Sequence, residues 1–179
     1  MNNPELFNRY AIALLELAIE KNETEEFREE VKLIRNIFKE YSEFADLLAS
    51  VNTELSKKFE IVDKIFKDFK EEIRTFIKII IRNKRSVYLY QIFKETLFRF
   101  DDYLKIEEGK LYLASDMSET DIAKIKKSVE EKEGIHLELT KIIDPSIIGG
   151  FIVVIKNNVY DSSVKTKLEN LKSSLLGGN

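Results

Sequence analysis

The sequence predicts an α+β protein: a bundle of six helices over residues 1–105, followed by a small α/β domain over residues 106–179. The distribution of turn-forming residues supports this division. No glycine or proline occurs from Asn22 through Glu108, and all six glycines come from Gly109 onward. Because glycine and proline interrupt helices and mark turns, the first part is expected to be helical. Apolar spacings of three and four dominate that part, whereas alternation appears in the second.

The apolar pattern of the first part predicts six successive amphipathic helices. Asn3-Pro4-Glu5 is typical of a helix start, with a cap, a proline and an acid. Thr24 and Ser56 are expected to cap the second and fourth helices, and Ser42 to begin the third. The residues expected to face inward are Leu6, Tyr10, Leu14, Phe27, Val31, Ile34, Phe38, Phe44, Leu47, Leu48, Phe59, Val62, Phe66, Ile73, Phe76, Ile77, Ile80, Ile81, Leu89, Ile92, Phe93, Leu97, Phe100 and Leu104.

The helix around residues 73–81 has more apolar surface than one packing face requires. A stripe of about 100° buries an ordinary surface helix, yet Ile79, Ile80 and Ile81 are consecutive. Either the bundle encloses this helix, or one side of it forms a groove with the first helix for a partner. Ala13 is small and lies off the main stripe, so a partner helix could approach closely there. The candidate docking residues are Tyr10, Ala13, Leu14, Ile77, Ile80 and Ile81.

The second part begins with a strand and a helix. Residues 111–115 alternate between two faces and predict a short strand. Ser118 with Asp121 resembles a capping box at the start of a charged helix, and Gly134 is expected to end that helix. The boundary between the domains is expected near residues 106–110, because Gly109 lies there in a polar stretch.

Strands and a helix complete the second part. Residues 135–140 predict a half-buried strand, and residues 147–155, apolar on both faces, predict a central strand. Asn157-Asn158 is expected to form a two-residue hairpin turn. Asp161 is expected to cap the last helix, and Gly177 and Gly178 to end it. The residues of this helix expected to face inward are Val164, Leu168, Leu171 and Leu175.

The adjacent glycines Gly149 and Gly150 admit two interpretations. A phosphate cradle needs a glycine-rich loop that leads into a helix N-terminus. Here the glycines lead into the apolar strand 151–155, and no lysine occupies the Walker position. A bend or a close approach of backbone is therefore the favoured interpretation.

The amino-acid composition excludes several classes of function. The net charge is −3, which disfavours nucleic acid as a partner, and the absence of cysteine excludes disulfides and cysteine-ligated metals. No apolar run approaches the roughly 20 residues that span a bilayer, and the start has no signal-peptide pattern. A reducing compartment such as a bacterial cytoplasm fits best. His136 is expected to be exposed, and Asp101 and Asp102 to point to different helix faces. We therefore expect no catalytic, cofactor or metal site, and an interaction protein.

The stretch from Asp144 to Leu175, DPSIIGGFIVVIKNNVYDSSVKTKLENLKSSL, resembles the C-terminal signature of the delta subunit of rotary ATP synthases. The mitochondrial counterpart of that subunit is the oligomycin sensitivity-conferring protein. The start RYAIAL, residues 9–14, and the apolar stretch 77–85 are similar to the family as well. Ser162 departs from the glycine common in the family, and is expected in the first turn of the last helix. The aromatic pair Tyr88 and Tyr90 is a second departure from the family pattern, and the sequence does not explain it. The matching signature residues are Asp144, Gly149, Gly150, Asp161, Ser163, Leu168 and Leu171.

The resemblance implies a non-catalytic stator subunit without a cofactor. It implies that the helical domain docks the N-terminal helices of the alpha subunits of the catalytic head. It further implies that the C-terminal domain contacts the C-terminal region of subunit b in the peripheral stalk. The expected location is the cytoplasmic face of a bacterial membrane, peripheral and without insertion into the bilayer. Two alternatives remain at this point: an unrelated helical protein–protein adaptor, and a small enzyme or nucleotide binder.

Overall fold

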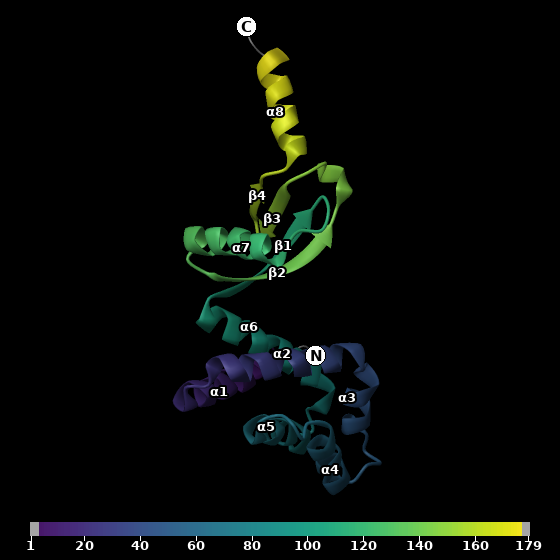
Figure 1. The fold of residues 1–179 in the computed structure, drawn as a ribbon. Helices are drawn as coiled ribbons and strands as arrows, with labels where there is room; N and C mark the ends of the chain where they lie inside the picture. Colours follow the sequence, from purple (N-terminus) through teal and green to yellow (C-terminus); the bar gives the residue numbers. More distant parts are fainter. Residues whose placement is uncertain (1–3, 177–179) are drawn as a thin grey trace. The chain divides into compact units, whose positions relative to one another are not determined.

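A computed structural model describes residues 4–176 and shows an α+β chain with a mixed four-stranded sheet in its C-terminal part (Figure 1). The chain divides into two compact units, residues 1–104 and 105–179. In the described part, the first unit contains α1 (Pro4–Lys21), α2 (Thr24–Glu40), α3 (Ser42–Ala49), α4 (Leu55–Ile65), α5 (Glu71–Arg82), the 3₁₀ turn η1 (Ser86–Tyr88) and α6 (Leu89–Leu104).

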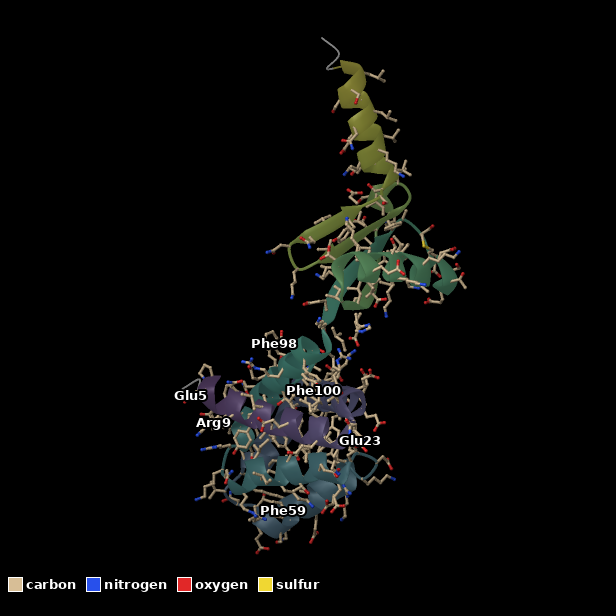
Figure 2. The ribbon with its side chains drawn as sticks, turned by 90° about the vertical axis from the view of Figure 1, so that its left-hand side faces the viewer. Glu5, Arg9, Glu23, Phe59, Phe98 and Phe100 are labelled. Carbon is tan, nitrogen blue, oxygen red and sulfur yellow. The ribbon has the colours of Figure 1, made fainter. Side chains whose placement is uncertain are left out.

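The core of the first unit is rich in phenylalanine. Phe38 stacks on Phe44 with ring centroids 5.6 Å apart, and Phe93 meets the edge of Phe76 at 5.7 Å. On α6, Phe100 is wholly buried whereas Phe98 is 57% exposed, so the helix has distinct inner and outer sides (Figure 2). The helical spacing of apolar residues thus predicted most of this core. Leu47, expected to face inward, is an exception at 46% exposed.

Two tyrosines that the sequence left unexplained belong to this core. The Tyr88 ring lies 5.5 Å from the ring of Phe7, and both Tyr88 and Tyr90 are partly buried against the helices.

The first unit also contains a buried charged side chain. Arg28 is 2% exposed, and its Nε donates to Asp101 Oδ1 at 2.6 Å, which links α2 to α6. These contacts give Tyr88, Tyr90 and Asp101 structural roles.

Helix starts differ from the sequence prediction in two places. The residues preceding α2 and α4 are Glu23 and Glu54, neither with a side-chain capping bond, so Thr24 and Ser56 are not caps. Ion pairs are found at the start of the second helix. Lys70 Nζ lies 2.9 Å from Glu23 and 2.6 Å from Glu26, joining the starts of α2 and α5. The third helix begins at Ser42 as expected. Asn3, Gly177 and Gly178 lie outside the described residues.

The second unit is built on a sheet with strand order β2-β1-β3-β4. β1 (Ile106–Leu113) pairs in parallel with β2 (His136–Ile143) and antiparallel with β3 (Phe151–Ile155), which pairs antiparallel with β4 (Asn158–Asp161). The helix α7 (Glu119–Glu133) runs along the sheet (Figure 1), and Val129 packs with the buried residues of the strands. Ser118 caps α7 and Gly134 ends it with φ 67°, which confirms both predictions.

Three strand predictions need correction. The first strand, expected over residues 111–115, is β1 and already begins at Ile106, so Lys105 alone separates it from α6, just before the boundary expected near residues 106–110. The run 147–155 is a strand only from Phe151, because Pro145–Ile147 forms a 3₁₀ turn. The hairpin turn is Lys156-Asn157, since Asn158 already pairs with Ile155 in the ladder. Lys156 adopts the positive φ, 49°, that the tight turn requires.

A fragment that ends at Leu104 is expected to fold by itself. Its core residues come from α1 to α6, so the cut removes none of them. The fragment should give a helical circular dichroism spectrum and a cooperative thermal transition. A spectrum typical of a disordered chain would contradict the division into independent units.

Candidate functional site

The described residues offer little for catalysis. Among residues 4–176, no cluster of three or more histidine, cysteine, aspartate or glutamate side chains could hold a metal ion. His136 is exposed at the start of β2, as its alternating pattern predicted. Within the same residues, no helix is long and apolar enough to cross a membrane. The features left for a function are exposed surfaces and the glycine pair that precedes β3.

The glycine pair forms a close contact with the segment before the last helix, α8 (Val164–Leu176). Gly150 has φ 76°, and a Cβ there would lie 2.3 Å from the carbonyl oxygen of Ser162. Gly149 accepts a hydrogen bond at 2.9 Å from the amide of Val164, the first residue of α8. Gly149 thus offers its carbonyl to α8, whereas a phosphate cradle would offer amides. The pair is therefore a structural joint that ties the start of β3 to the start of α8.

Two acidic signature residues stabilise turns beside this joint. Asp144 Oδ1 accepts from the amide of Ser146 at 3.0 Å, and contacts with Ser146 lower the pKa of Asp144. Asp161 accepts from the Thr166 hydroxyl at 2.7 Å and from the Ser163 amide at 2.8 Å. These bonds, the one from Thr166 foremost, lower the pKa of Asp161. Both carboxylates therefore fix backbone geometry.

The cap of α8 is Ser163 and not Asp161. The Ser163 hydroxyl accepts from the amide of Thr166, the third residue of α8, at 3.2 Å. This is the geometry of an N-cap, and Ser163 is 1% exposed. Asp161 supports the cap from two residues upstream. Ser162 therefore lies before the helix, not in its first turn as the sequence analysis expected.

The apolar side of α8 is exposed, contrary to the prediction that it faces inward. Leu168 is 52% exposed, Leu171 60% and Leu175 84%, while Val164 at 37% is the most covered of the four. In Figure 1 the helix extends away from the sheet of its own unit. The spacing of four, three and four residues places these side chains in one stripe. We call Val164, Leu168, Leu171 and Leu175 the α8 seam.

A groove of about 380 Å³ lies between α1 and α5. Its apolar part comes from α1 and from one side of α5, and carboxylates lie toward one end. The lining residues are Ala13, Leu14, Leu17, Glu71, Glu72, Thr75, Phe76 and Ile79. Lys21 donates to Glu72, which raises the pKa of Lys21 and lowers that of Glu72. One acid of that end is thus paired, and the other, Glu71, is exposed to solvent.

The structure places the residues expected at this groove in two groups. Ala13 and Leu14 line it, whereas Ile77, Ile80 and Ile81 are at most 3% exposed and belong to the core. The member of the isoleucine run that faces the groove is Ile79, which is 42% exposed. Its spacing from Glu72 and Thr75 on the polar side of α5 could have identified it, because residues three, four and seven apart share a helix face.

Tyr10 does not line the groove but links its two helices. The Tyr10 hydroxyl accepts from Asn83 Nδ2 at 2.9 Å and from Arg85 Nη1 at 3.1 Å. Its ring meets the edge of Phe76 at 5.9 Å between centroids. These contacts fasten α1 to the segment that follows α5. Tyr10 therefore acts by holding the groove walls in place.

The family model and the sequence relatives identify the same family along nearly the whole chain. Residues 6–175 match the family described as ATP synthase delta (OSCP) subunit. The chain is 32% identical over 168 residues to the ATP synthase subunit delta of Mycoplasma mobile, with 93% of each chain covered. It is 33% identical over 180 residues to that of Halalkalibacterium halodurans, covering 99% of this chain and 98% of the relative.

The fold is similar to a chain in the mitochondrial ATP synthase hexamer of Toxoplasma gondii. The TM-score is 0.58 at 23% sequence identity, with 96% of this chain and 97% of that chain covered. The structural likeness supports the fold, and the sequence matches show the family. The chain belongs to the ATP synthase delta (OSCP) subunit family, whose members are non-catalytic peripheral-stalk components of the F-type ATP synthase.

Proposed function

We propose that the chain joins the catalytic head of the ATP synthase to its peripheral stalk, so that the head resists rotation and proton flow is coupled to ATP synthesis. In this proposal the helices of residues 1–105 form a six-helix bundle that docks the N-terminal helices of the alpha subunits. Residues 106–179 contact the C-terminal region of subunit b. The observation that carries the proposal is that each compact unit has an exposed apolar surface: the α1/α5 groove in the first unit and the α8 seam in the second.

The proposed location is the cytoplasmic face of the bacterial membrane, where the chain is a peripheral part of the complex. The bacterial relatives named ATP synthase subunit delta support an assignment to a bacterial enzyme. An attachment through protein surfaces is consistent with the apolar α1/α5 groove and the exposed apolar stripe of α8.

The α1/α5 groove suits an amphipathic helix of the head. A helix that binds in a groove places side chains three, four and seven residues apart against an apolar floor. Ala13 has a small side chain and is exposed, so the partner backbone can approach α1 closely at that point. Phe76 and Ile79 supply apolar contacts from α5. We therefore assign the alpha-subunit helix to this groove.

An aspartate in this groove is expected to weaken head binding at least tenfold, which corresponds to about 1.4 kcal/mol. Ala13→Asp and Ile79→Asp each place a charge against the apolar face of the bound helix, where it loses solvation. Both positions are exposed, so the variants should keep the circular dichroism spectrum of the parent. Affinity is measured with a fluorescent peptide of the alpha-subunit N-terminus. Ile81 is unsuitable for this test, because an acid at a position 3% exposed would disrupt the core.

Leu33→Asp is the matched control, since Leu33 is 54% exposed on α2 and does not line the groove. It should bind the peptide as the parent does. If both groove variants are folded and bind with unchanged affinity, the groove is not the docking site.

The α8 seam suits a helix of the stalk. Assigned to a seven-residue repeat, Leu168 and Leu175 take the a positions, and Val164 and Leu171 the d positions, of a coiled-coil strand. Lys165, Lys167 and Lys172 then occupy positions at the edges of the seam. Such edge positions pair with opposite charges on a partner helix. A second copy of α8 would set lysines against lysines, which favours a partner whose seam has acidic edges.

A further inference from the structure

A second groove of the first unit lies between the α3–α4 connection and the segment that follows α5. It encloses about 470 Å³, compared with about 380 Å³ for the α1/α5 groove. Leu55 from α4 and Val51 from the connection line it, and Ile81 and Val87 come from the other wall. We call it the basic groove, for the charges described below.

Apolar side chains at this groove are unusually accessible. Val51 is 98% exposed, Val87 51% and Leu55 44%. One exposed apolar residue is ordinary, whereas several around one concave surface are typical of an interaction site. Val51 in particular gains nothing from the fold, because its side chain is almost wholly in solvent. A partner that covered these three residues would remove apolar area from water.

Every charged side chain that lines the groove is a cation. The three are Lys58, Arg82 and Lys84. The Arg82 guanidinium lies over the Phe59 ring, 5.8 Å from its centroid. Over residues 4–176, neither Lys58 nor Lys84 forms an ion pair with a carboxylate within 4.0 Å. The α1/α5 groove differs, because its lining charges are the carboxylates of Glu71 and Glu72.

Local helix electrostatics explains only part of this charge. Arg82 and Lys84 lie at the C-terminal end of α5, where cations complement the helix dipole. Lys58 is the fourth residue of α4, and the dipole of that helix does not account for a cation there. The first turn of α4 contains no acid, whereas α2 and α5 each begin with two. The helix dipole thus accounts for Arg82 and Lys84 but not for Lys58, and the three cations together are available to an external anion.

We propose that the basic groove binds an acidic amphipathic segment of a partner protein, distinct from the segment bound between α1 and α5. Apolar side chains of the segment lie among Val51, Leu55 and Val87, and its carboxylates face Lys58, Arg82 and Lys84. The charged residues that line the two grooves differ in sign, so the grooves favour peptides of different charge. The helical unit thus carries two docking sites with different charge preferences.

The test uses the full-length chain and two synthetic helical peptides. Both have a leucine stripe at helical spacing; glutamates flank the stripe in one, and lysines replace them in the other. By fluorescence anisotropy, the glutamate peptide should bind the parent chain and the lysine peptide should bind at least tenfold more weakly. Arg82→Glu/Lys84→Glu and, separately, Val51→Asp should each weaken the glutamate peptide at least tenfold. Val51 is so exposed that its replacement leaves the fold intact.

Two controls separate this proposal from general charge effects and from head docking. Arg9→Glu/Lys94→Glu changes the net charge equally at exposed positions outside the groove, and should bind the glutamate peptide like the parent. Ala13→Asp should also leave this binding unchanged, so the two grooves are tested independently.

Equal affinity for both peptides, or affinity unaffected by the groove variants, overturns the proposal. Vesicles of phosphatidylglycerol are titrated in parallel. Binding to them that is lost in the same variants, without affinity for the glutamate peptide, would show that the groove contacts an anionic lipid surface instead.

Discussion

Replacing Gly150 with valine is expected to destabilise the second unit by about 3 kcal/mol, at the upper end of the strain typical of such sites. Gly150 has φ 76°, which β-branched residues adopt badly, and the new Cβ would lie 2.3 Å from the Ser162 carbonyl oxygen. A contact that short forces a backbone shift. Amide hydrogen exchange of β1 and β3 measures the loss, because those amides report opening of this unit alone.

Gly134→Val is the matched control for the Gly150 variant. Gly134 has a similar φ, 67°, but a Cβ there meets no atom within 4 Å. The Gly134→Val substitution should therefore destabilise the second unit only through backbone strain, by about 1 kcal/mol. Equal losses in the two variants would show that the approach of Gly150 to Ser162 is unimportant. An ATP affinity present in the parent and absent in Gly150→Val would restore the phosphate-cradle interpretation.

The double variant Leu168→Asp/Leu171→Asp is expected to weaken binding to the C-terminal region of subunit b about a hundredfold, or about 2.8 kcal/mol. These side chains lie in the α8 seam, 52% and 60% exposed, so their replacement leaves the fold intact. In a coiled-coil contact they would be the central buried anchors, and truncating such anchors typically accounts for most of the affinity. Affinity is measured by calorimetry with a soluble fragment of subunit b.

Asn170→Asp/Ser173→Asp serves as the control for the seam variant. Both residues are exposed on α8, and their spacing from Leu168 and Leu171 places them on the opposite side of the helix. The control adds two negative charges without touching the seam, and binding should persist. If this control loses as much affinity as the seam variant, charge on α8 governs the contact and the seam does not. Binding by the parent should also weaken with salt, because three lysines flank the seam.

The sequence predicted which residues share a face more reliably than what covers that face. The isoleucines of α5 illustrate the limit. Their run of three required one to point outward, but the bundle determines that this residue is Ile79 rather than Ile81. The α8 seam illustrates it again, since its spacing was recognised while its exposure was not. A periodic pattern looks the same whether the partner surface belongs to the same chain or to another protein.

Tertiary contacts explain the other differences. Lys70 pairs with Glu23 and Glu26 at the start of α2 from a position 46 residues away from Thr24, so local sequence patterns could not predict these ion pairs. Arg28 is buried because α6 supplies Asp101, a pairing that helix periodicity does not encode. The hairpin differs by one residue because Lys156 adopts a positive φ that its residue type does not suggest. The glycine pair was interpreted correctly, because its residue type restricts the backbone directly.

In the proposed function, one chain holds the head and the stalk through separate surfaces. Native mass spectrometry of the full-length chain mixed with purified catalytic head and a soluble fragment of subunit b tests it most directly. The parent should form a ternary complex. Ala13→Asp/Ile79→Asp should retain the stalk fragment and lose the head, and Leu168→Asp/Leu171→Asp should do the reverse. A parent chain that binds either component only in the absence of the other, or a folded variant that loses both, would rule out separate surfaces for the head and the stalk.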